Sequence, residues 1–348
     1  MSAILNERTA AVLESIIRQY IARAQPVSSA AVIAECYLEV CSATVRNDMA
    51  RLEEEGYISH PHHAAGSIPT EKGYRYYVEK LKNAQLPLDE RLLINHLFHQ
   101  IEKELDSWLS LAVGLVSQRA QNVAVVTSPR QAAARFHHLE LVPLQDRLSL
   151  AVLIMRGARV RQQLVSFEKS LTTFELGVMS DRLNHFYGGL TRRDIEKSVR
   201  QLSDEETLIK DAIIKMMRIE EEQQNQEPHM EGLKFFLGQP EFMESARAQP
   251  FMDLVERRQL GEIIESENPP GGDIRVFIGQ ENRSPQIKDY SLVLGHYGLP
   301  DEAVGSIGVI GPTRMPYDRT IASVRYLAGV MSALVAELYG REPDNSGQ

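Results

Sequence analysis

The sequence predicts an α+β protein with more than one domain, and three observations support this fold class. The first eighty residues have the pattern of three helices followed by two short strands. β-prone runs then occur in two groups, within 122–166 and within 274–310. A helical block at 203–272, with no strand signal of its own, lies between the two groups. One α+β domain interrupted by an inserted helical subdomain is the simplest interpretation.

Composition limits the possible functions. The chain has 348 residues, of which 24% are charged and 43% hydrophobic, and its net charge is −9. It is long enough for two or three domains. The acidity argues against indiscriminate coating of nucleic acid or acidic membranes. The first eighty residues contain eight basic and ten acidic side chains, so any DNA contact there must come from a local asymmetry of charge.

The cellular compartment is predicted from the cysteines and the apolar runs. Two cysteines are too few for a disulfide framework, and buried thiols in a reducing cytosol are the simplest account of them. The sequence shows no basic-then-apolar leader, and no apolar run approaches the length that spans a bilayer. These features predict a cytoplasmic protein.

Two N-terminal helices are predicted from caps and apolar spacing. Asn6 can cap the first helix, because its side-chain oxygen can accept a hydrogen bond from a free backbone amide. Pro26 ends this helix, and Ser28 or Ser29 can cap a short helix that extends to about Cys36. The apolar face of the first helix consists of Leu13, Ile16, Ile17, Tyr20 and Ile21.

The third predicted helix starts at Ser42 and is stopped by Gly56. Val45, Met49 and Leu52 have the i, i+4, i+7 spacing of a buried stripe. Residues on the opposite face are either small or able to bond phosphates or base edges. They are Ala43, Arg46, Asn47 and Ala50, with Thr44 and Arg51 on the flanks.

The segment after Gly56 predicts a hairpin and a fourth helix. Residues 57–59 and 67–69 are short β-prone runs around a turn, and Thr70 can cap the helix that follows. Three helices and a hairpin form the order of a winged helix-turn-helix, in which the third helix enters the major groove and the wing touches the neighbouring backbone. The alternative is an ordinary helix and hairpin in a globular core. The pattern therefore favours nucleic-acid binding.

Three motifs, in order along the chain, add a family resemblance. They are SATVRNDMARLEEEGYI, AGSIPTEKGYRYYV and SIGVIGPTRMPYDRTIASVRYLAGVMSALV. With these motifs the chain resembles, almost from end to end, HrcA, the family of bacterial heat-inducible transcription repressors. Two features depart from the family pattern. Ser67 stands where the wing usually carries an arginine, and Cys36 and Cys41 are unexpected beside the recognition helix.

The resemblance implies a function and a domain organisation. It implies a homodimer that represses chaperone operons by binding the CIRCE inverted repeat, and whose active fold is promoted by the chaperonin GroE. It also implies a GAF-like domain carrying an inserted dimerising subdomain. The expected domains are a winged-helix DNA-binding domain at 1–83, a GAF-like α/β domain at 88–202 and 273–340, and the inserted dimerising subdomain at 203–272.

The predicted site residues lie on the recognition helix, the wing and the helix after it. Arg46 can grip guanine and Asn47 can read adenine, or either can hold a phosphate. The predicted DNA-binding residues are Ser42, Ala43, Thr44, Arg46, Asn47 and Thr70, the phosphate candidates Arg51, Lys72, Tyr74 and Arg75, and the wing-tip residues His62, His63 and Ser67. The predicted dimer interface consists of Leu208, Ile209, Ile213, Met216 and Met217.

Catalytic chemistry has little support, so no enzyme activity, cofactor or metal is predicted. His60, His62 and His63 lack carboxylate or cysteine companions at ligand spacing. Glycines that recur every third residue from Gly305 do not form a dinucleotide fingerprint, and no P-loop occurs. These glycines are predicted to let a strand pack closely against a helix. The remaining alternative is a metabolite-sensing transcription factor, gated by a ligand in the GAF-like domain.

Overall fold

The protein is described here by a computed structural model. It describes residues 5–340, except 37–41, 62–65, 82–83, 103, 131–134, 157–158, 224–226, 244, 268–272 and 301–302. The chain forms two compact units. The first contains Met1–Thr127, Glu227–Gly298 and Gly305–Gln348, and the second contains Ser128–Gln226 and Leu299–Val304. A mixed helix-and-sheet architecture is present in both units, as the sequence predicts.

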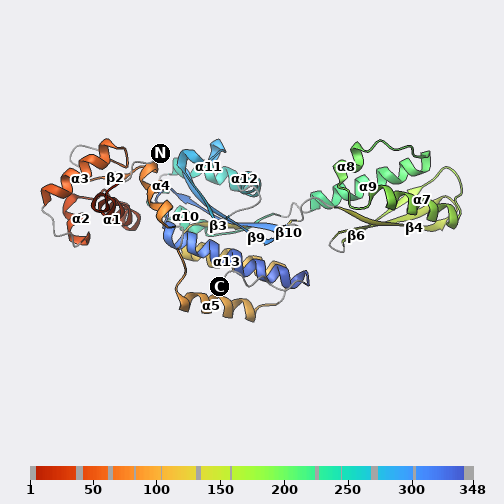
Figure 1. The fold of residues 1–348 in the computed structure, drawn as a ribbon, viewed down its shortest axis with the longest axis horizontal. Coiled ribbons are helices and arrows are strands. Elements are labelled where there is room, and N and C mark those ends of the chain that lie inside the picture. The colour runs from red at the N-terminus through yellow and green to blue at the C-terminus, as the bar shows by residue number, and fades with distance from the viewer. Residues whose placement is uncertain are drawn as a thin grey trace. The chain divides into compact units, whose positions relative to one another are not determined.

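The N-terminal part of the first unit follows the predicted order of elements (Figure 1). Asn6 caps the first helix by accepting a hydrogen bond of 2.8 Å from the amide of Thr9, and Thr70 caps the fourth helix. Gly56 has a φ of +76°, the left-handed conformation expected at a helix stop. The elements are α1 (Glu7–Arg23), α2 (Ser29–Cys36), α3 (Ser42–Glu54), β1 (Ile58–Ser59), β2 (Ile68–Pro69) and α4 (Glu71–Lys80).

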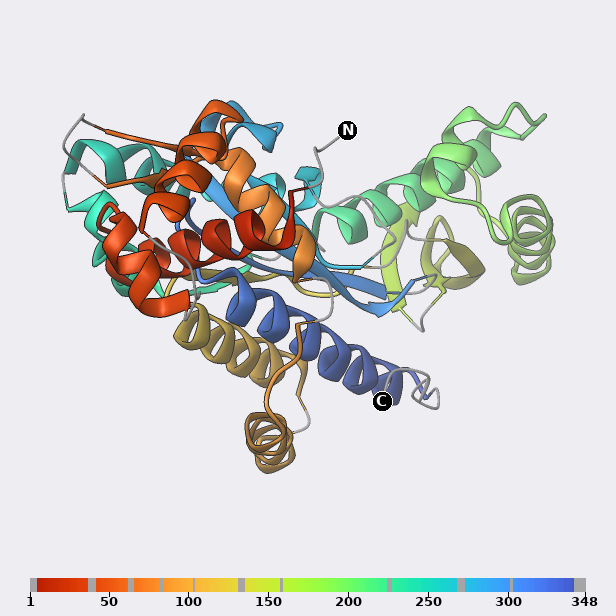
Figure 2. The same cartoon turned by 60° about the vertical axis from the view of Figure 1, so that its left-hand side comes forward.

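The rest of the first unit is a five-stranded sheet with helices around it (Figures 1 and 2). The strand order is β7-β3-β10-β9-β8, and β3 pairs antiparallel with both β7 and β10. The strands are β3 (Val123–Val126), β7 (His229–Glu231), β8 (Arg275–Ile278), β9 (Tyr290–Leu299) and β10 (Ala303–Pro312). The helices are α5 (Leu88–Gln100), α6 (Leu105–Ala120), α10 (Leu233–Leu237), α11 (Ser245–Glu256), α12 (Leu260–Glu267) and α13 (Tyr317–Leu338).

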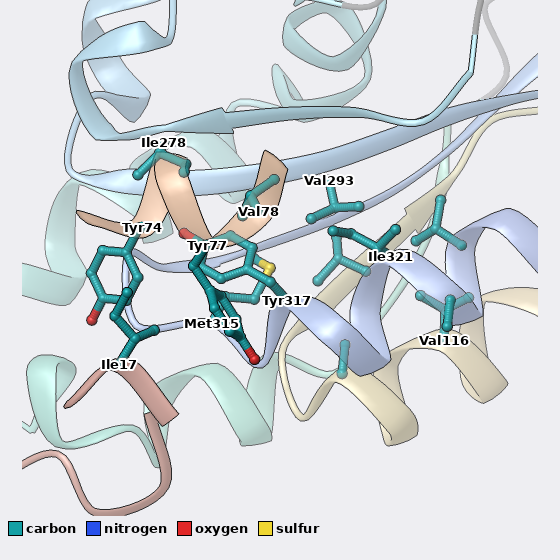
Figure 3. Packing of buried hydrophobic residues seen from close by; sticks show 14 of the residues in the cluster. Ile17, Tyr74, Tyr77, Val78, Val116, Ile278, Val293, Met315, Tyr317 and Ile321 are labelled. Carbon is teal, nitrogen blue, oxygen red and sulfur yellow. The ribbon is translucent and has the colours of Figure 1, made fainter. Parts of the chain in front are cut away.

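One continuous apolar core joins the N-terminal helices to the sheet and to α13. In Figure 3, Tyr74 and Tyr77 of α4 lie beside Met315 and Tyr317, and the same cluster includes Ile17 of α1. Each fully buried apolar side chain of this kind stabilises the fold by roughly 1.5–3 kcal/mol. The helix α13 is long and apolar enough to cross a membrane, but half of its apolar window is buried inside the protein. That burial is what a core helix requires.

The second unit has its own three-stranded antiparallel sheet, with strand order β4-β5-β6. Its elements are β4 (Phe136–Gln145), β5 (Leu148–Met155), β6 (Arg159–Ser166), α7 (Thr173–Tyr187), α8 (Arg192–Lys197) and α9 (Asp204–Gln223). A capping box starts α9: the amide of Glu206 donates to Ser203 Oγ, and the amide of Ser203 donates to the Glu206 carboxylate.

The extent of the inserted unit differs from the prediction of 203–272. It begins at Ser128, because β4, β5 and β6 pair with one another and not with the larger sheet. The helix α9 packs on this small sheet, whereas Glu227–Gly298 belong to the first unit and add β7 to its sheet. Strand propensity shows that a segment is extended but not which sheet it joins.

A break around Ile101 separates α5 from α6. One smaller expectation is also corrected. The glycines that start at Gly305 lie within β10, where an added Cβ would meet the side chains of Tyr297 and Leu294 on the neighbouring strand. Two of them therefore allow strands to approach each other, whereas the prediction was contact with a helix.

Candidate nucleic-acid interface

The helix α3 has one buried and one exposed face, as predicted. Val45 and Leu52 are fully buried and Met49 nearly so, within the core of the first unit. Ala43, Arg46, Asn47 and Ala50 are all exposed. The side chains of Arg46 and Asn47 form no hydrogen bond or ion pair with the residues that the structure describes. The polar face of α3 is therefore available to a ligand outside the chain.

A buried carboxylate that the sequence did not reveal as functional fixes the orientation of α3. Asp48 is 6% exposed and accepts two hydrogen bonds from Arg8 of α1, at 2.7 and 3.1 Å, and one from the hydroxyl of Thr9 at 3.2 Å. The pairing raises the pKa of Arg8. The sequence spacing could have identified this residue. Asp48 follows Val45 by three residues and therefore lies on the buried face of α3, where a carboxylate needs a hydrogen-bond or ion-pair partner.

The hairpin after α3 is anchored at its base. β1 pairs antiparallel with β2, and Ser67 forms a further bridge to Val27, with amide-to-carbonyl distances of 2.9 and 2.8 Å. Ser67 is completely buried, so its prediction as a wing-tip contact is wrong. The other two predicted wing-tip residues, His62 and His63, lie outside the described residues.

The helix α4 also differs from prediction at one phosphate candidate. Tyr74 is only 2% exposed, and its ring centroid lies 5.8 Å from that of Tyr317. Burial raises the pKa of Tyr74 well above its ordinary value, and its hydroxyl has no hydrogen-bond partner among the residues that the structure describes. With almost no surface open to solvent, Tyr74 cannot reach a phosphate, so the prediction for this residue is wrong.

The remaining phosphate candidates already have partners within the chain. Arg51 pairs with Glu55 at 2.8 Å, one helical turn away. Lys72 donates to the Glu55 carbonyl at 2.5 Å and lies 4.1 Å from the centre of the Tyr57 ring. Arg75, which is partly buried, donates to the carbonyl of Val276 at 2.7 Å and pairs with Glu281. Arg75 is thus committed to the sheet region of its own unit.

Thr70 performs a structural task. Its hydroxyl oxygen accepts a hydrogen bond of 3.3 Å from the amide of Gly73, and the hydroxyl donates to the carbonyl of Gly56 at 2.7 Å. These two bonds join the end of α3 to the start of α4. Ser42 and Ala43 are exposed at the first turn of α3, and Thr44 is half-buried.

The predicted dimer interface is largely interior. Ile209, Ile213 and Met217 are fully buried and Met216 is 2% exposed, all within the core of the second unit. They pack beneath the small sheet and cannot contact another subunit, so the prediction for these four is wrong. Leu208 is the exception, with 43% of its surface exposed.

An apolar surface exists instead on the open face of the β4-β5-β6 sheet. Three apolar side chains face one another across the three strands: Val142 on β4, Leu150 on β5 and Leu164 on β6. Four residues further along β5, Ile154 pairs with Val160 of β6. Val142, Val160 and Leu164 are 40%, 58% and 55% exposed. Single exposed apolar residues are ordinary on protein surfaces, whereas a group of them on one face is a candidate interaction surface. Glu140 and Gln162, on either side of Val152, occupy the rung between the two apolar ones.

Comparison with known proteins bears on what these surfaces are for. Residues 106–321 match the family model described as the HrcA protein C terminal domain. A heat-inducible transcription repressor HrcA of Dehalococcoides mccartyi is 54% identical over 340 residues, which cover 98% of this chain and 99% of that protein. The one from Roseiflexus castenholzii is 38% identical over 354 residues and covers 99% and 98% of the two chains.

A solved structure agrees with the fold. A crystal structure described as that of a hypothetical protein has a TM-score of 0.58 with 24% sequence identity, and covers 96% of this chain and 98% of its own. The exposed polar helix and the full-length relatives together define the class of protein, a transcription repressor, which is not a class of enzyme. The chain belongs to the HrcA family of heat-inducible transcription repressors.

Proposed function

We propose that the chain represses heat-shock genes by placing α3 in the major groove of operator DNA. The observation that carries the proposal is the exposed pair Arg46 and Asn47 on a helix whose opposite face is locked into the core. A major groove admits an α-helix, arginine can bond guanine bidentately, and asparagine can do the same with adenine. Ser42, Ala43 and Thr44 complete the proposed surface of α3, and Arg51 joins it by leaving its ion pair with Glu55.

The proposed fold of the first eighty residues is a winged helix-turn-helix. Its support is the order of three helices and a hairpin, together with the bridge between Val27 and Ser67 that fixes the hairpin to the segment before α2. We assign the five-stranded sheet and its helices to a GAF-like domain by family resemblance. Lys72 remains a candidate phosphate contact, because the residue is exposed and an ammonium group that donates to the Glu55 carbonyl still has two further N–H donors.

The proposed assembly is a homodimer that binds an inverted repeat. A single winged helix makes few contacts with DNA bases. Two winged helices related by a two-fold axis make twice as many, and they require an operator with the same two-fold symmetry. We relocate the proposed interface from α9 to the open face of the β4-β5-β6 sheet, where Val142, Val160 and Leu164 are exposed together. A second copy of the same surface would cover these side chains and remove them from water.

Sedimentation tests this interface. Leu164→Asp should dissociate the dimer, because the carboxylate would be buried without a partner. Leu208→Asp, at an exposed position of α9, is the matched control and should leave the mass unchanged. A dimer that survives Leu164→Asp and is lost with Leu208→Asp would restore the interface on α9.

The heat response follows from marginal stability in this proposal. By family resemblance the chaperonin GroE promotes the active fold, and heat diverts the chaperonin to unfolded clients. A change of about 1–2 kcal/mol in the free energy of unfolding shifts the active fraction several-fold. The family's repressor names do not favour the metabolite-gated alternative. The compartment that fits the proposal is the cytoplasm.

The experiment that tests the proposed function measures binding to an inverted-repeat duplex and to a scrambled duplex across a salt series, with and without chaperonin. The inverted repeat should bind more tightly at every salt concentration, and both affinities should fall as salt rises because counterions are released from phosphates. Equal affinity for the two duplexes would contradict a sequence-reading repressor.

A further inference from the structure

One imidazole ring connects the end of α3 to both strands of the hairpin. His60 directly follows β1, and its Nδ1 lies 2.7 Å from Oε1 of Glu53 in the last turn of α3. Its Nε2 lies 3.1 Å from the hydroxyl oxygen of Ser67, which directly precedes β2. We refer to these three residues, Glu53, His60 and Ser67, as the wing bridge.

The chemistry of the wing bridge is self-consistent. An ionised carboxylate only accepts hydrogen bonds, so Nδ1 carries the proton that is donated to Glu53. In the tautomer with its proton on Nδ1, Nε2 accepts from the Ser67 hydroxyl. These residue types also form hydrolytic triads, but Ser67 is completely buried and offers no nucleophile to a substrate. The arrangement therefore serves to connect the helix to the hairpin.

Ser67 is a fixed point for this connection. Its amide and carbonyl exchange hydrogen bonds with Val27. A Cβ on Gly66 would lie 2.5 Å from the carbonyl carbon and oxygen of Val27, so the two backbones are in direct contact. Because Ser67 cannot shift without disturbing the core, His60 and Glu53 are held relative to it.

We propose that His60 is a positioning residue for DNA binding, which fixes the angle between the wing and α3 before the duplex arrives. This inference rests on the proposed DNA-binding function. A wing that is not held must be ordered during binding, and the lost freedom weakens the complex. The side chains of His60 and Glu53 are 30% and 46% exposed, so their contact contributes little to global stability. The bridge therefore affects DNA affinity more than folding.

The variant Glu53→Ala distinguishes a positioning role of the wing bridge from a simple effect of charge on DNA affinity. The change removes a negative charge from the proposed DNA-binding region, and charge alone predicts tighter binding. Loss of the bridge predicts the opposite, an affinity for the inverted repeat that falls by about tenfold because the wing is no longer preorganised. Fluorescence anisotropy with a labelled duplex measures the difference.

Two neighbouring variants are the controls. Glu54→Ala removes the same charge from an exposed position outside the bridge and should bind as tightly as the wild type or more tightly. Glu53→Gln keeps a carbonyl oxygen that accepts from Nδ1, so it should rescue binding while the charge stays absent. His60→Ala should match Glu53→Ala, and the double variant should be no weaker than either single one, because both break one bridge.

The outcomes separate this inference from the proposed function. If Glu53→Ala binds as tightly as Glu54→Ala, or if Glu53→Gln is as weak as Glu53→Ala, the positioning role is wrong. Thermal unfolding reports on the fold of each variant, and the two exposed glutamate positions decide the question even if His60→Ala does not fold. A wild-type protein that does not prefer the inverted repeat would refute the proposed function itself.

Discussion

The helices α3 and α4 come from one motif-rich stretch of the chain, yet they use their polar residues in opposite ways. α3 leaves Arg46 and Asn47 exposed and unpaired within the described part of the chain. α4 turns Tyr74 into the core and commits Arg75 to Glu281 and Val276. An arginine that already has a carboxylate partner must give it up before it can bind a phosphate. The two helices therefore differ in whether their polar side chains are free to bind DNA, and not in the types of residue they carry.

The largest effect is expected at Tyr74. Tyr74→Ala should lower the free energy of unfolding by about 3–5 kcal/mol, because it leaves a cavity beside Tyr317. Chemical denaturation measures the change. Tyr74→Phe is the control: it removes only a hydroxyl that has no partner in the described part of the chain, so stability should change by less than about 1 kcal/mol. A loss of DNA affinity in a stable Tyr74→Phe variant would restore this residue to the interface.

Arg46→Ala tests the opposite side of the comparison. It should weaken binding to a cognate duplex by about 1–3 kcal/mol and relax the base preference at one position. Stability should not change, because Arg46 is exposed. Competition with single-base variants of the duplex measures the preference. If affinity falls equally for scrambled DNA, Arg46 holds a phosphate and does not read a base.

The pH dependence of stability tests whether α4 belongs to the core. Burial raises the pKa of Tyr77 from 10.0 to about 12. Because the folded state holds this proton more tightly than the unfolded chain, the stabilisation is complete below pH 10 and is lost as pH rises toward 12. The stability of the wild type relative to Tyr77→Phe should therefore decline across that range. A constant difference would show that Tyr77 titrates normally.

The smallest effect is expected for Arg75→Ala. Its ion pair with Glu281 is partly exposed, so stability should fall by no more than about 1 kcal/mol. Affinity for DNA should change less than in Arg46→Ala. Parallel denaturation and anisotropy experiments measure both quantities. A loss of affinity as large as that of Arg46→Ala would show that Arg75 leaves Glu281 to bind DNA.

Features that depend on a single helix or a single turn were predictable from the sequence. The caps at Asn6 and Thr70, the stop at Gly56 and the two faces of α3 follow from spacing and hydrogen-bonding capacity. Errors arose where distant segments meet. Ser67 is buried because it pairs with Val27, forty residues earlier, and Tyr74 is buried because Tyr317 covers it.

The extent of the inserted unit was unpredictable for the same reason. The sequence predicted β-prone runs within 122–166, and the structure has strands there, including β5 at Leu148–Met155. Which strands share a sheet depends on long-range pairing, which a single sequence does not encode in its periodicity. Ile209, Ile213, Met216 and Met217 of α9 were predicted to contact a second subunit, but they pack in the core of their own unit.

The claim that the exposed face of α3 reads DNA is tested most directly by measuring the DNA sequence specificity of two arginine variants. The ratio of affinities for inverted-repeat and scrambled duplexes is compared among the wild type, Arg46→Ala and Arg75→Ala at one salt concentration. The account predicts that the ratio collapses for Arg46→Ala and is retained by Arg75→Ala. An unchanged ratio in Arg46→Ala would contradict the claim that the exposed face of α3 reads DNA.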